Sequence, residues 1–215
     1  MEKNDGRNLK NQILNLAGDM FREYGYKGTT FQRIADQLGI AKSTITYYYG
    51  NKFMLMEYWI DDYFDMLKKF IDSFHDEYKN KYWRHCVIYS YVYRTMLQNE
   101  RNQELFYHEK EQSLWQNYEI ETVARIYESI EKDFKIPYEL DDLRIKAHID
   151  MGARRNLYET YVNSPGSLSI NRFVYYHLYL IGILCKLDEK TISENIQSAD
   201  DFVSKHTPPV HKVFR

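Results

Sequence analysis

Residues that break helices are scarce in this chain. Its 215 residues include only four prolines and nine glycines, and most of them fall near the ends of segments with helical periodicity. Proline lacks an amide donor and glycine is conformationally free, so both residues punctuate regular structure. No segment shows the alternation of apolar and polar residues that marks a half-buried strand. We therefore expect an all-α chain built from long helices.

Three helices are expected in the N-terminal fifty residues. The first covers roughly Leu9–Tyr24 and is followed by Gly25, which is typical of a left-handed C-terminal cap. The pattern Thr29-x-x-Gln32 predicts a capping box at the start of the second helix, and Gly39 permits a sharp turn into the third. Two short helices joined by such a turn are typical of a helix-turn-helix that enters the DNA major groove.

The third expected helix carries a lysine and many hydroxyl donors. They are Lys42, Ser43, Thr44, Thr46, Tyr47 and Tyr48. Cations and hydroxyl groups contact phosphates, and a lysine also reaches guanine acceptors. Residues 1–52 hold eight Lys and Arg against five Asp and Glu, although the whole chain has a net charge of −2. This distribution favours local rather than global contact with phosphate.

The remainder of the chain is also expected to be helical. Asn51 can cap a helix of about 25 residues that opens at Lys52. The further helices predicted from apolar periodicity are Tyr82–Asn99, Glu104–Gln116, Glu119–Phe134, Leu140–Asn163, Ile170–Leu187 and Thr191–Lys205.

Several classes of protein are disfavoured. Cys86 and Cys185 lie 99 positions apart, which predicts buried free thiols in a reducing cytoplasm. The N-terminus has no apolar signal core, and the longest apolar run, Phe173–Cys185, is short for a membrane span. We therefore expect a cytoplasmic protein without a membrane partner. No nucleophile grouping, Gly-rich phosphate loop or metal-ligand spacing is visible, so no enzymatic activity, cofactor or metal is expected.

The N-terminal fifty residues resemble the tetracycline-repressor (TetR) family of bacterial transcriptional regulators. The resemblance has no gaps and rests on Ile13-Leu14, Ala17, Phe21, Gly25-Tyr26, Thr29-Thr30, Ile34-Ala35, Leu38-Gly39-Ile40, Lys42, Thr44-Ile45, Tyr48-Tyr49 and Asn51-Lys52. It implies a helix-turn-helix DNA-binding domain over residues 1–52 and a helical ligand-binding and dimerisation domain over residues 53–215. It also implies a homodimer that binds a palindromic DNA operator, most often as a repressor.

The resemblance also implies roles for individual residues. It places phosphate contacts at Thr30 and Lys52, and contacts to bases or backbone at Lys42, Ser43, Thr44, Thr46, Tyr47 and Tyr48. Two residues depart from the family pattern. Thr46 stands where the family often has a tyrosine, and Ala41 stands where a serine often caps the recognition helix. The loss of such a cap costs about 1 kcal/mol.

In the second domain, the resemblance implies dimerisation through helices near 140–163 and 170–187. The chain contains 21 tyrosines, which we expect mainly at the edges of the core. An aromatic pocket for a small-molecule effector is a second interpretation, with candidates Trp83, Tyr91, Arg94, Trp115 and His148. Two alternatives remain: a regulator without an effector whose second domain binds another protein, and a helical ligand-binding protein with a vestigial DNA-binding module.

Overall fold

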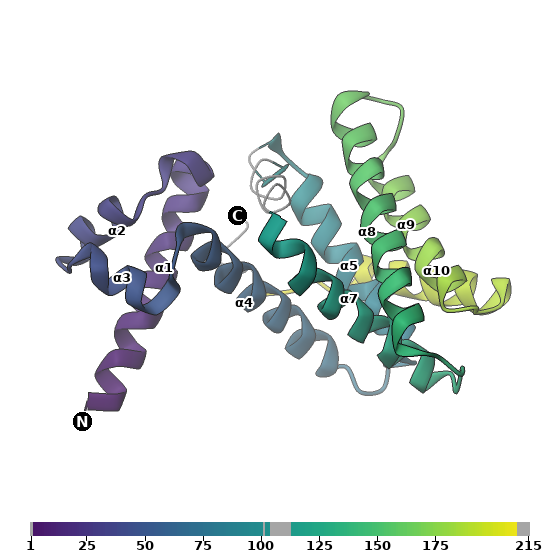
Figure 1. The fold of residues 1–215 in the computed structure, drawn as a ribbon. Helices are drawn as coiled ribbons and strands as arrows, with labels where there is room; N and C mark the ends of the chain where they lie inside the picture. The colour runs from purple at the N-terminus through teal and green to yellow at the C-terminus, as the bar shows by residue number, and fades with distance from the viewer. Residues whose placement is uncertain (1, 101, 104–112, 210–215) are drawn as a thin grey trace. The chain divides into compact units, whose positions relative to one another are not determined.

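A computed structural model describes residues 2–100, 102–103 and 113–209 of the chain (Figure 1). No strand is found in these ranges, so the prediction of an all-α fold is confirmed. The described helices are α1 (Glu2–Gly28), α2 (Phe31–Leu38), α3 (Lys42–Tyr49), α4 (Lys52–Asp72), α5 (Lys81–Leu97), α7 (Ser113–Asp133), α8 (Leu140–Asn163), α9 (Ile170–Leu184) and α10 (Glu189–Lys205). The helix predicted over Glu104–Gln116 lies largely outside the described residues. None of the described helices is long and apolar enough to span a bilayer.

Contacts divide the chain into two compact units. The first contains Met1–Phe70, which we call the N-terminal unit. The second contains Ile71–Leu97 and Gln112–Thr207, which we call the body. The boundary falls within α4, whereas the sequence predicts a division after residue 52.

Apolar side chains from four helices form the core of the N-terminal unit. Ile13 of α1, Ile34 of α2 and Ile45 of α3 are fully buried. Trp59 brings α4 into the same unit, and its indole lies directly against Gly18 of α1. A Cβ atom at Gly18 would overlap that indole, so α1 and α4 can approach closely only because this residue lacks a side chain.

The start of α2 differs from the predicted capping box by one residue. The cap is Thr30, whose Oγ1 accepts a hydrogen bond from the Arg33 amide at 3.2 Å. Thr29 is instead fully buried, and its hydroxyl donates to the carbonyl oxygen of Gly25 at 2.9 Å. Gly25 has a φ of 68°, and the backbone kink there interrupts the helical pattern of α1. The prediction of Thr29 as the cap is wrong because this side chain faces the kink rather than the α2 amides.

The boundaries of α3 and α4 follow the expectations more closely. Gly39 closes α2 in the left-handed region with a φ of 64°. Ala41 occupies the N-cap position of α3 and provides no side-chain hydrogen bond. The Asn51 side chain accepts a hydrogen bond from the Met54 amide at 2.9 Å, which confirms its predicted capping of α4.

In the body, α5 is buried on nearly all sides. It packs mainly against α10 and α9, while α7 packs along α8. Aromatic side chains fill the core, and Tyr82 satisfies its hydroxyl by donating to the Leu178 carbonyl at 2.8 Å. Cys86 and Cys185 are buried free thiols, as predicted.

Two pairs of buried polar side chains join helices of the body. Lys146 of α8 forms an ion pair with the fully buried Glu131 of α7. His177 of α9 pairs with Asp150 of α8. Buried charges are tolerated when they are paired in this way, and the pairs hold α7, α8 and α9 in a defined register.

Candidate nucleic-acid interface

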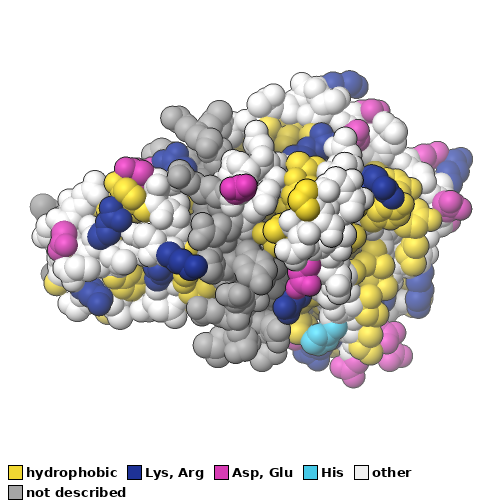
Figure 2. Space-filling view, turned by 90° about the horizontal axis from the view of Figure 1, so that it is seen from above, with side chains coloured by type: hydrophobic (Ala, Val, Ile, Leu, Met, Phe, Trp, Pro, Cys, Tyr) yellow, Lys and Arg dark blue, Asp and Glu magenta, His cyan; other side chains and the backbone are white. Residues whose placement is uncertain are grey.

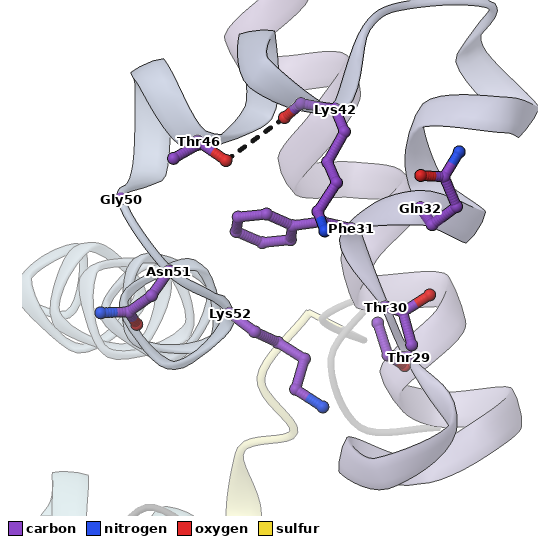
Figure 3. A pocket seen from close by; sticks show the side chains of 9 residues that line it. All are labelled: Thr29, Thr30, Phe31, Gln32, Lys42, Thr46, Gly50, Asn51 and Lys52. Carbon is purple, nitrogen blue, oxygen red and sulfur yellow. Dashed lines mark hydrogen bonds between the residues drawn. The ribbon is translucent and has the colours of Figure 1, made fainter.

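A cleft of about 430 Å³ lies on the N-terminal unit, between the start of α2, the helix α3 and the start of α4. Figure 3 shows Lys42 of α3 and Lys52 of α4 reaching into this cleft from different sides, with Thr30 facing it from the start of α2. The buried ring of Phe31 provides an apolar wall. The full lining is Thr29, Thr30, Phe31, Gln32, Lys42, Thr46, Gly50, Asn51 and Lys52.

The start of α2 adds a positive electrostatic contribution to this cleft. Its first turn contains no acidic residue, so the positive end of the helix dipole is not neutralised within the helix. Free amide groups at a helix start, together with hydroxyls and lysines, are the groups that bind phosphate oxygens. The cleft therefore contains the kinds of group that bind a phosphate of the DNA backbone.

Lys52 also connects α4 to the segment after the kink in α1. Its Nζ donates to the Tyr26 carbonyl oxygen at 2.8 Å and lies 4.0 Å from the centroid of the Tyr26 ring. Burial there lowers the pKa of Lys52. An ammonium group has three donors, so this contact leaves donors for a phosphate while fixing where the charge lies.

Two inward-facing residues fix the orientation of α3. Ile45 is fully buried, and Tyr49 is buried with its hydroxyl donating to the Lys10 carbonyl oxygen at 2.7 Å. The Tyr47 side chain is 84% exposed, and the Thr46 hydroxyl donates to the Lys42 carbonyl of its own helix at 3.3 Å. Of the remaining predicted contact residues, Lys42 and Ser43 are exposed, and Thr44 and Tyr48 are half-buried. The outward face of α3 is thus a continuous row of cationic and hydroxyl side chains.

The segment that builds this geometry was compared with known protein families. Residues 13–58 match the family model of the bacterial regulatory proteins of the tetR family. This match identifies residues 13–58 as an N-terminal module of the tetR type. A search of curated proteins found no match to the chain. The matched residues run from α1 through the helix-turn-helix into α4, and they include all eight predicted contact residues.

The fold brings to this module further residues that were not among the predicted DNA contacts. Gln32 and Asn51 line the cleft. Arg33 donates to the Gly28 carbonyl oxygen at 2.7 Å, and its guanidinium lies 3.8 Å from the centroid of the Tyr24 ring. These contacts join residues that the sequence spaces irregularly, so periodicity and motif spacing do not predict them.

The four predicted effector residues whose side chains the structure describes do not line one common pocket. Trp83 is buried in the core of the body, and Tyr91 is buried with its hydroxyl donating to the His206 carbonyl at 2.6 Å. His148 is exposed on α8. Arg94 lines a surface pocket to which Trp83, Tyr91 and His148 do not contribute. The side chain of Trp115 lies outside the described residues, and effector binding by this set stays a prediction.

Proposed function

We propose that this protein is a homodimeric transcriptional repressor of the tetR family that binds a palindromic DNA operator and is released by a small-molecule effector. The observation that carries the proposal is the donor-bearing face of α3 beside a cleft that contains Lys42, Lys52 and Thr30. In this arrangement, Lys42 and Tyr47 contact base edges, while Thr30 and Lys52 hold the adjacent phosphate.

Dimerisation supplies the specificity that one short helix lacks. A helix of eight residues reaches few base pairs, whereas two copies read two half-sites one helical turn apart. A two-fold symmetric dimer also matches the symmetry of a palindrome. This is why the proposal includes a dimer.

An apolar stripe on the body supports dimerisation through α8 and α9. Ile145 and Ile149 of α8 are 56% and 47% exposed, and Ile183 of α9 is 50% exposed. Gly152 continues the α8 stripe at helical spacing, and a Cβ atom there would meet nothing within 4 Å. Figure 2 shows hydrophobic side chains gathered in a band on the body. A contiguous apolar surface of this kind is typical of an interface, and the small residue would permit close approach of a second helix.

Release by an effector requires a difference in binding energy between two states. A ligand shifts the protein away from DNA only if it binds the DNA-free form more tightly than the DNA-bound form. The surface pocket that contains Arg94 supports this part of the proposal, because it offers the body a place to bind a ligand.

Gel shifts with DNA from upstream of the protein's own gene test the proposal. The wild type should bind with steep salt dependence, and the Lys42→Ala, Tyr47→Ala double variant should bind about a hundredfold more weakly, because it loses two base contacts per half-site. Lys69→Ala is the matched control, since Lys69 is an exposed basic residue in the last turn of α4. Equal binding by the double variant and the wild type would refute the assigned contacts. Failure of the wild type to bind would favour a vestigial module.

A further inference from the structure

A pocket of about 440 Å³ lies on the body between α5, α9 and α10. Its volume falls within the range of ordinary small-molecule sites. Three features of its lining determine which ligand the pocket can bind. They are hydrogen-bond donors from α5, a positive charge from the first turn of α9, and an apolar surface from α9 and α10.

The donors are Ser90 and Arg94, which lie one helical turn apart on α5. Ser90 is only 3% exposed and lines the pocket. The Nε of Arg94 is buried without an acceptor, although its Nη2 pairs with Asp200. Buried polar groups are nearly always hydrogen-bonded, so an unpaired donor beside a pocket favours a ligand that carries acceptors.

Arg172 gives the pocket its excess positive charge. Its guanidinium lies 5.7 Å from the centroid of the Tyr176 ring, and no carboxylate among the described residues forms an ion pair with it. The charge of Arg94, by contrast, is matched by Asp200. An arginine binds a carboxylate in a planar two-point geometry, so the unmatched guanidinium favours an organic anion.

The apolar part of the pocket is formed by Val174, Ile196 and Tyr175. Val174 and Ile196 are buried, and the half-exposed Tyr175 ring stacks with Tyr179 at a centroid distance of 5.7 Å. Aliphatic and aromatic walls of this kind favour a flat apolar ligand body, because aromatic rings pack against one another in offset or edge-to-face arrangements.

We propose that this pocket binds a small aromatic carboxylate that carries a second hydrogen-bond acceptor. The carboxylate pairs with Arg172, the ring packs against Val174, Ile196 and Tyr175, and the second acceptor meets the Ser90 hydroxyl. This assignment names a ligand class for the proposed effector, so its consequence for DNA binding rests on the proposed function. Binding of the carboxylate itself does not depend on DNA.

Calorimetric titration of the full chain without DNA tests the assignment. The probes are 4-hydroxybenzoate and 6-hydroxy-2-naphthoate, with the corresponding neutral amides as controls. Arg172→Gln should weaken binding of the carboxylates by about tenfold or more, and Ser90→Ala should weaken it by a smaller factor. Arg155→Gln is the matched control, because it removes an exposed arginine of α8 that pairs with Glu159 and does not line the pocket. It should leave binding unchanged.

Three results would overturn the assignment: no binding of either carboxylate at millimolar concentration, equal binding by Arg172→Gln and the wild type, or equal binding of the acids and their amides. A gel shift with the bound probe then separates this inference from the proposed function. If the probe binds through Arg172 but operator affinity stays constant, the pocket assignment holds and the effector part of the proposed function fails.

Discussion

The carboxylate of Asp150 lies 2.6 Å from Nε2 of His177, with both side chains buried inside the body. Nδ1 of His177 in turn lies 3.1 Å from the Tyr93 hydroxyl. Burial alone would raise the pKa of Asp150, but the charge and hydrogen bond of His177, together with the nearby charge of Arg154, hold that pKa at about 2. A continuous series of hydrogen bonds thus connects α8, α9 and α5.

Replacing Asp150 by Asn should destabilise the body strongly. The substitution keeps the shape of the side chain but leaves His177 without its charge partner, and breaking a buried pair costs about 3–5 kcal/mol. Urea unfolding of the full chain measures this loss. Asp141→Asn is the control on the same helix, since the Asp141 side chain is 92% exposed, and it should change the free energy of unfolding little. Equal stability of Asp150→Asn and the wild type would contradict the role given to this pair.

Acid should destabilise the protein through His85. Burial and, to a lesser extent, the charge of His177 lower the pKa of His85 to about 3. In the unfolded chain its pKa is about 6.5, so the unfolded state takes up the proton first as the pH falls. The contribution of His85 to the free energy of unfolding is complete above the pKa that this histidine has in the unfolded chain. It decreases as the pH falls towards 3, with a limiting slope of about 1.4 kcal/mol per pH unit. Between pH 7 and pH 4, the free energy of unfolding should fall less steeply for His85→Gln than for the wild type. Parallel curves of this free energy against pH would refute the role given to His85.

The two N-caps of the helix-turn-helix predict opposite changes. Ala41 already has the extended backbone of a cap, with φ −73° and ψ 142°, but lacks a side-chain acceptor. Ala41→Ser should therefore stabilise the chain by about 1 kcal/mol, whereas Thr30→Ala should destabilise it by a similar amount. Thermal unfolding of the two variants beside the wild type measures both changes. A decrease in stability on Ala41→Ser would show that the α3 amides already have other partners.

Lys52→Gln should make operator binding less dependent on salt. If the lysine neutralises one phosphate per subunit, the slope of log affinity against log salt becomes shallower by about 0.9 per subunit. The same change also removes the hydrogen bond to the Tyr26 carbonyl, so circular dichroism is needed to verify the fold. Lys69→Gln should leave the slope unchanged. An unchanged slope for Lys52→Gln in a folded protein would make this lysine purely structural.

Ile149→Lys should convert the proposed dimer into a monomer. It places a charge in the centre of the α8 stripe, where a second copy would bury it without a partner. Sedimentation velocity measures the change in mass. Leu140→Lys is the matched control, because Leu140 is 66% exposed at the start of the same helix and lies away from the stripe. Equal masses for the wild type and Ile149→Lys would exclude this face as the interface.

The local sequence pattern predicted where the helices lie, but it did not predict which residues of different helices contact one another. The predicted helix Leu140–Asn163 agrees with α8 at both ends, because apolar periodicity is written into consecutive residues. The one-residue error at Thr29 arises at the kink in α1, where its hydroxyl donates to the Gly25 carbonyl four residues earlier. The contact between Lys52 and Tyr26 joins residues 26 positions apart, and no local rule pairs them. The same holds for the pocket around Arg172, which requires three helices to meet.

Tyr47 and Tyr49, two positions apart in α3, lie on opposite sides of the helix. Tyr49 is buried and tied to Lys10, while Tyr47 is 84% exposed. Under the proposed function, mutations of Tyr47 would change which operator the protein binds without altering how its helices assemble. Drift in DNA preference, and deliberate re-targeting to a new operator, can then proceed on this outer face while the inner face stays constant.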